Sequence, residues 1–108
     1  MRFISEDIEK YCKDYSVNDT DLLKELSKTT WETEEIPQML SGSLVGGLLQ
    51  MLIKISGAER ILEIGMFTGY SALKMAEVLP EHGKIHSCEL MEKHVKTATA
   101  WFEKSDIN

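Results

Sequence analysis

Apolar residues recur along the chain with two different patterns. Where they recur every three or four residues they predict an amphipathic helix, and where they run together with β-branched residues they predict a strand. The five helices predicted in this way span residues 5–13, about 18–30, 44–56, 70 or 71 to 79, and 92–104. The two predicted strands span residues 61–64 and 84–90. From residue 58 the order is strand, helix, strand, helix, which predicts a parallel right-handed βαβ unit and an α/β fold.

Short polar residues mark the places where the predicted helices begin, because their side chains accept free N–H groups of a first turn. The expected N-caps are Ser5, Asn18 or Asp19, Ser43 and Ser71. Gly57 is expected to end the third helix. Inside that helix Gly46 and Gly47 each cost about 1 kcal/mol relative to alanine, so we expect them to pack closely against another backbone or a ligand.

The segment from residue 29 to 43 has no helical period, and its three glutamates precede Pro37 and Gly42. It predicts a loop, which is either a ligand contact or an acidic solvated connector. The same segment is the one place where the pattern resembles a domain boundary. We therefore expect a single domain, residues 1–108, made of N-terminal helices with this loop (1–42) and the start of a cofactor-binding α/β unit (43–108).

Composition narrows the classes of partner. The formal net charge is −6 and the basic residues are scattered among carboxylates, which argues against nucleic acid. No run approaches the about 20 apolar residues of a membrane span, so we expect no membrane partner and a cytoplasmic protein. Cys12 and Cys88 are expected to be reduced, with Cys88 inside a buried strand. His82, His86 and His94 show no metal-ligand spacing with the cysteines, so surface or strand-filling roles are expected for them.

A glycine turn, Gly65-Met-Phe-Thr-Gly69, lies between the first strand and the fourth helix. Glu89 ends the second strand 24 positions after Gly65, close to the roughly 20-residue spacing at which an acid meets a ribose diol. The middle glycine of a dinucleotide site is absent, so a pyrophosphate fits poorly and an NAD-dependent oxidoreductase is disfavoured. A nucleoside with an amino-acid tail and no phosphate fits better, since Thr68 and Ser71 offer hydroxyls. S-Adenosylmethionine has this shape.

Glu63 is a carboxylate near the end of the first strand, which we expect to be covered on both faces of a parallel sheet. A buried carboxylate needs hydrogen-bond partners. The expected partners are backbone N–H groups of the following loop or a ligand.

The stretch Leu62-Glu-Ile-Gly-Met-Phe-Thr-Gly-Tyr-Ser-Ala72, with Gln38-Met-Leu-Ser41 before it and Cys88-Glu89 after it, resembles the O-methyltransferases of the caffeoyl-CoA and catechol type. The resemblance implies a Rossmann-like class I methyltransferase fold that uses S-adenosylmethionine. That fold has a seven-stranded sheet with helices on both faces. This chain would supply the N-terminal helices and the first βαβα portion of the sheet.

The resemblance also implies a set of cofactor-binding residues. They are Met39, Ser41, Glu63, Gly65, Phe67, Ser71, Glu89 and Leu90. The first two would contact the cofactor from the loop, and the glycine turn would present its backbone to it. Glu63 would bind the methionine end, Ser71 its carboxylate, Glu89 both ribose hydroxyls, and Leu90 would lie near the adenine.

The implied activity is methyl transfer to a hydroxyl of a catechol-like small molecule, in a homodimer formed through the N-terminal helices. In this family a divalent metal, usually magnesium, is held at the ends of later strands, and this sequence stops at Asn108 without counterparts of those motifs. Magnesium is therefore expected only in a full-length enzyme, no catalytic residue is assigned, and the 108-residue chain is expected to be inactive alone. The alternative is a non-catalytic dimerisation or regulatory module derived from a methyltransferase.

Overall fold

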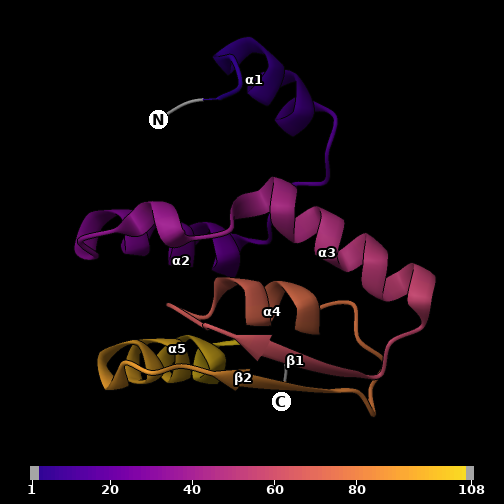
Figure 1. Cartoon of the computed structure of the whole chain (residues 1–108), viewed down its shortest axis with the longest axis vertical. Helices are drawn as coiled ribbons and strands as arrows, with labels where there is room; N and C mark the ends of the chain where they lie inside the picture. The colour runs from indigo at the N-terminus through magenta and orange to yellow at the C-terminus, as the bar shows by residue number, and fades with distance from the viewer. Residues whose placement is uncertain (1–2, 107–108) are drawn as a thin grey trace.

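The computed structural model describes residues 3–106 and contains six helical segments and two strands there (Figure 1). In chain order they are α1 (Glu6–Asp14), α2 (Asp21–Thr33), the short 3₁₀ helix η1 (Pro37–Met39), α3 (Gly42–Ser56), β1 (Arg60–Ile64), α4 (Tyr70–Ala76), β2 (Lys84–Cys88) and α5 (Glu92–Lys104).

The two strands form a parallel sheet, with Arg60 opposite Lys84 and Ile64 opposite Cys88. Figure 1 shows α4 between this sheet and α3, while α1 stands apart at the end of the molecule. The predicted order of strand, helix, strand and helix is confirmed, and so is the α/β class. A parallel pair needs a crossover connection, which α4 supplies.

The expectation that the strands are covered on both faces is wrong for the described residues. The side chains of Leu62 and Ile64 are 67% and 77% exposed, and Cys88, which we expected to be buried, is exposed as well. Strand residues alternate between two faces, and the described helices cover only the face that contains Ile61 and Glu63.

The core joins α2, α4 and α5. It consists of Leu23, Leu26, Tyr70, Leu73 and Trp101. Beside it the hydroxyls of Thr30 and Thr68 form a buried hydrogen bond of 2.9 Å, which fixes the end of α2 against the glycine turn. Burial of this kind stabilises by about 25 cal/mol for each Å² of apolar surface removed from water, so these side chains set the position of the turn.

Helix starts follow the predicted caps only in part. The hydroxyl of Ser5 accepts the N–H of Ile8, as predicted. The cap of α2 is Thr20, not Asn18 or Asp19. Ser43 and Ser71 lie within the first turns of α3 and α4 and cap neither helix. Gly57 ends α3 in the left-handed conformation (φ 68°), as predicted.

The segment predicted to be a loop is shorter than expected, because α2 continues to Thr33 and η1 follows it. Gly46 is closely packed, but against a side chain and not another backbone, because a Cβ atom there would lie 2.8 Å from Cγ of Lys74. The expectation of close packing is wrong at Gly47, where a Cβ atom would meet nothing within 4 Å.

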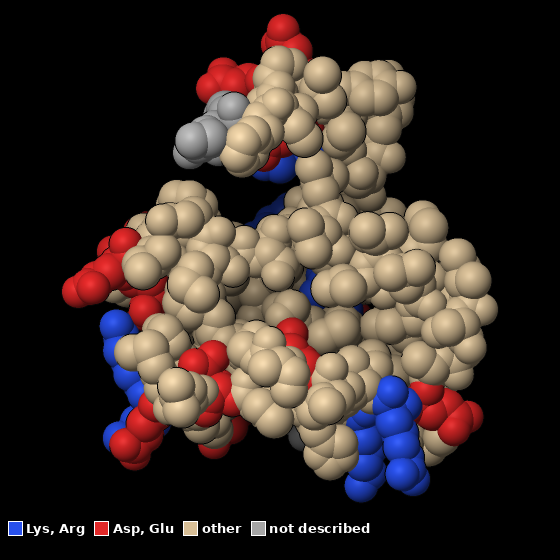
Figure 2. Space-filling model, viewed as in Figure 1, with Lys and Arg blue, Asp and Glu red and all other residues tan. Residues whose placement is uncertain are grey.

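An apolar stripe runs along the outer side of α3, and its side chains are exposed. It consists of Val45, Leu48, Met51, Leu52 and Ile55. Figure 2 shows a broad surface without charged residues over this helix. Against our expectation, the segment Pro37–Ser56 passes as a membrane span by length and composition alone, with a mean hydropathy of 1.4 over an 18-residue window. A single such helix is weak evidence for a membrane, because a helix covered by a partner has the same composition.

Candidate functional site

The glycine turn adopts backbone conformations that favour glycine. Gly65 has φ 88° and Gly69 has φ 98°. A Cβ atom at Gly69 would lie 3.0 Å from Cε1 of Phe102 and 3.1 Å from Cβ of Ala98, so this glycine also permits close contact with α5. In front of Gly65 the space is open, with nothing within 4 Å of a Cβ position. The turn therefore presents open backbone at the carboxyl end of β1.

Glu89 holds the turn together. Its Oε1 atom accepts the N–H groups of Met66 (3.0 Å) and Phe67 (2.8 Å), and its Oε2 atom accepts the N–H of Met91 (3.1 Å). The N–H groups of Met91 and Phe67 hold the pKa of this carboxyl below its usual range. Phe67 donates its N–H to Glu89 from a backbone conformation with a positive φ of 51°. An ionised carboxylate has about four lone-pair sites, and three N–H groups leave acceptor capacity for a ligand.

Glu63 ties three elements together. It accepts a hydrogen bond from Ser71 Oγ on α4 and another, 2.9 Å long, from Ser87 Oγ on β2. The expectation that loop N–H groups are its partners is wrong, because its side chain points to the α4 side of the sheet, where these hydroxyls lie. The carboxylate is half-buried and satisfied by the protein itself.

The structure brings together five of the eight predicted cofactor-binding residues. Glu63, Gly65, Phe67, Ser71 and Glu89 surround the glycine turn through the contacts given above. The other three, Met39, Ser41 and Leu90, are exposed, and Leu90 is 98% exposed just beyond Glu89. An exposed apolar side chain beside a nucleoside site can be covered by a base.

Two charged clusters support this site and were not predicted from the sequence. The first joins Asp19, ahead of α2, to Tyr70 and Lys74 on α4. Asp19 accepts a hydrogen bond of 2.8 Å from Lys74 Nζ and one from the Tyr70 hydroxyl, whose oxygen lies 2.8 Å from each carboxylate oxygen. Burial, and then the hydrogen bond to Asp19, raise the pKa of Tyr70 above its usual value, so the phenol remains a donor. Asp19 is thus a partner of α4 and not the cap of α2.

The second cluster surrounds His94. The prediction of a surface or strand-filling role is wrong for this residue, which is 9% exposed on α5. Its Nε2 atom lies 3.1 Å from Glu34 Oε1, and its Nδ1 atom lies 3.8 Å from Glu89 Oε2. No spacing rule links residues 34, 89 and 94, so only their packing could identify this cluster.

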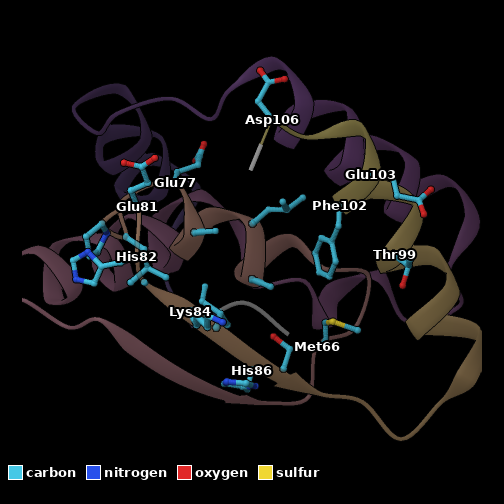
Figure 3. Close-up of a pocket in the computed structure, with 18 residues that line it drawn as sticks. Met66, Glu77, Glu81, His82, Lys84, His86, Thr99, Phe102, Glu103 and Asp106 are labelled. Carbon is cyan, nitrogen blue, oxygen red and sulfur yellow. The ribbon is translucent and has the colours of Figure 1, made fainter. Parts of the chain in front are cut away.

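A separate cavity lies elsewhere. It has a volume of about 1100 Å³ and is lined by α4, β2 and α5. Figure 3 shows Met66, Thr99 and Phe102 along one part of its wall and Glu77, Glu81 and His82 at another. None of the eight predicted cofactor-binding residues lines it. The glycine turn remains the candidate site.

The implied divalent metal does not fit the described residues. Between residues 3 and 106 no group of three or more His, Cys, Asp or Glu side chains is arranged to hold a metal ion. No chemical step is therefore derived through a metal here. The expectation of magnesium in a longer enzyme stays a prediction.

Comparison with known proteins gives consistent matches. The family model described as O-methyltransferase matches residues 13–108. A caffeoyl-CoA O-methyltransferase of Stellaria longipes is 32% identical over 105 residues, which is 95% of this chain and 43% of that protein. Caffeoyl-CoA O-methyltransferase 1 of Zea mays is 33% identical over 109 residues, 95% of this chain and 40% of that protein.

Solved structures agree with the fold. The methyltransferase PaMTH1 of Podospora anserina, bound to S-adenosylhomocysteine, has a TM-score of 0.85 at 26% identity, over 96% of this chain and 47% of that one. An O-methyltransferase of Bacillus cereus, also in complex with S-adenosylhomocysteine, has a TM-score of 0.81 at 30% identity. That match covers 91% of this chain and 44% of the Bacillus cereus chain. The chain spans less than half the length of these relatives.

The parallel βαβ unit, its glycine turn and the acid after β2 define part of a Rossmann-like cofactor-binding fold. With the family match over residues 13–108, the chain belongs to the O-methyltransferase family whose relatives include the caffeoyl-CoA enzymes. The predicted resemblance to O-methyltransferases and the predicted Rossmann-like fold class are confirmed.

Proposed function

We propose that this chain is the cofactor-binding part of an S-adenosylmethionine-dependent O-methyltransferase. The observation that carries the proposal is the arrangement of Glu89 and the glycine turn. An ionised acid with spare acceptor capacity lies at the carboxyl end of β2, beside open backbone at the carboxyl end of β1. Ligands of open α/β sheets bind outside the carboxyl ends of the strands.

The proposed roles follow from these positions. Glu89 offers its remaining lone-pair site to the ribose diol while the turn holds it in place, and Leu90 and Met91, which are exposed, lie beside the adenine. Ser71, whose hydroxyl donates to Glu63, retains lone pairs and lies on the side proposed for the amino-acid tail. Met39 and Ser41 contribute from the segment around η1. When bound, the cofactor supplies the methyl group on its sulfonium.

The proposed acceptor is a hydroxyl of a catechol-like small molecule, which is supported by the caffeoyl-CoA relatives. The 108-residue chain is expected to transfer no methyl group by a metal-dependent route on its own. A non-catalytic dimerisation module is the second candidate, and the exposed apolar stripe on α3 favours it.

Calorimetric titration of S-adenosylhomocysteine into the purified chain tests the cofactor role. We expect saturable binding at one site, with no heat from NAD under the same conditions, because the turn lacks the glycine that admits a pyrophosphate. If the chain is folded by circular dichroism and gives no heat with S-adenosylhomocysteine, the cofactor role is wrong for this chain.

We also propose that a second copy of the chain covers the apolar stripe of α3, so that the protein is a homodimer. An exposed contiguous apolar stripe of this kind marks an interaction surface. Leu52→Glu places a charge in the stripe and is expected to convert dimer to monomer in sedimentation velocity. Val95→Glu is the matched control, since Val95 is exposed but lies on α5, outside both α3 and the N-terminal helices. A monomeric parent chain, or a dimeric Leu52→Glu variant, would contradict the proposal.

A further inference from the structure

His94 lies where four parts of the molecule meet. It is the third residue of α5 and is buried. One ring nitrogen faces Glu34, in the segment after α2, and the other faces Glu89, the acid after β2. The edge of its ring meets the ring of Phe67 in the glycine turn, with centroids 4.8 Å apart and an angle of 84° between the planes. The side chains of Glu34 and Glu89 are only 6% and 11% exposed.

The two contacts of this imidazole differ in kind. The Nε2 atom is at hydrogen-bond distance from Glu34, 3.1 Å. The Nδ1 atom, at 3.8 Å from Glu89, makes an electrostatic contact that is too long for a hydrogen bond. Glu34 has a second cationic partner, Lys93 Nζ at 3.3 Å, whereas the other partners of Glu89 are backbone N–H groups. Among the described residues, His94 is therefore the side chain that can place a positive charge against Glu89.

The number of carboxylates to which His94 can donate depends on whether its ring carries one N–H group or two. A neutral imidazole has one N–H donor and one acceptor nitrogen, so it can donate to only one of the two glutamates. An imidazolium has two donors and a positive charge, and it attracts both. At low exposure such a charge is weakly screened by water.

We propose that His94 is a positioning residue of the cofactor site, which in its protonated form fixes Glu89 against the glycine turn and ties it to Glu34, so that nucleoside affinity depends on His94. This inference rests on the proposed cofactor role and assigns a residue outside the eight predicted ones. It gives the segment after α2 a direct connection to the acid that meets the ribose. His94 acts through Glu89 and needs no contact with the cofactor.

Loss of the imidazole removes the side chain that faces Glu89 opposite its backbone donors. The affinity for S-adenosylhomocysteine is expected to fall by roughly tenfold in His94→Gln.

The experiment is calorimetric titration of S-adenosylhomocysteine, at one pH, into the parent chain, His94→Gln and His82→Gln. His82→Gln is the matched control, because His82 also pairs with a glutamate, Glu59 at 3.0 Å, but is exposed and distant in the fold from the turn. We expect the affinity to fall roughly tenfold in His94→Gln and to stay unchanged in His82→Gln. Equal affinity in all three chains would overturn the inference and leave the cofactor role intact.

A second measurement needs no cofactor. Hydrogen exchange at the N–H groups of Met66 and Phe67 reports how firmly Glu89 holds the turn. The exchange is expected to accelerate in His94→Gln. It is expected to accelerate less strongly in Glu34→Gln, which removes the Glu34 carboxylate and keeps the imidazole. The N–H of Gly57, which bonds within α3, serves as the internal reference. Unchanged exchange at Met66 and Phe67 in both folded variants would overturn the inference even if no ligand binds.

Discussion

Glu89→Gln is expected to weaken the binding of S-adenosylhomocysteine by roughly 10- to 100-fold, because a hydrogen bond to a charged group contributes about 1.5–3 kcal/mol and the three N–H donors leave Glu89 one lone-pair site for the ribose diol. The amide keeps the size of the side chain but replaces one acceptor oxygen by an NH₂ group. That group would face either the N–H groups of Met66 and Phe67 or the N–H of Met91. Titration calorimetry measures the loss.

The matched control for this variant is Glu59→Gln. Glu59 is an exposed glutamate just before β1, and it pairs only with the exposed His82 among the contacts described. Its replacement is expected to leave the affinity unchanged. A Glu89→Gln variant that binds as tightly as the parent chain would remove Glu89 from the ribose site.

The same substitution should alter the response to acid. Because the pKa of Glu89 is lowered in the folded chain, its ionised form contributes stability that is fully present above the ordinary value of 4.5 and is lost as pH falls through the lower, folded value. Glu89→Gln lacks this contribution at every pH. Its free energy of unfolding should therefore fall less steeply with acid below about pH 4.5 than that of the parent chain.

Asp19→Ala is expected to reduce the free energy of unfolding by roughly 3–5 kcal/mol, the cost of leaving one partner of a buried ion pair alone. The Lys74 side chain is 3% exposed and its stem packs beneath Gly46, so the ammonium cannot reach water without moving α3. Tyr70 would lose its acceptor as well. Since a whole domain is stable by about 5–15 kcal/mol, urea denaturation should show a large shift or an unfolded variant.

A double variant separates the missing partner from simple loss of packing. Replacement of a buried pair by apolar residues of similar volume is often neutral or stabilising, so Asp19→Leu with Lys74→Met should recover most of the lost stability. Lys10→Ala is the control, because Lys10 forms an exposed ion pair with Asp14 that contributes about 0.3–0.5 kcal/mol. A double variant that is as unstable as Asp19→Ala would contradict the ion-pair explanation.

The secondary structure could be predicted from the sequence because its signals are local. The helix at residues 92–104 was predicted with the bounds observed for α5, and Gly57 ends α3 through its own left-handed conformation. The two strands were found at nearly their observed bounds. The glycine turn and Glu89 were predicted together, since the spacing along a βαβ unit fixes which strand ends meet.

Caps were less predictable, because several neighbouring polar residues compete for one position. Asp19 and Thr20 both suit the start of α2, and Asp19 is removed from the competition by Lys74, more than fifty residues away in the chain. Ser71 has the right chemistry for a cap, yet the backbone at Gly69 begins the helix earlier and frees the hydroxyl for Glu63.

The sequence by itself determined the order of helices and strands, the parallel sheet, the turn and the acid beside it. Only the tertiary structure decided that His94 joins Glu34 to Glu89, that Lys74 is buried against Asp19, and that Leu62 and Ile64 are exposed in the described part of the chain. Local patterns specify elements because caps and periodicity act over a few residues. Contacts between residues 34, 89 and 94 arise only when packed elements bring distant side chains together, and no spacing along the chain encodes them.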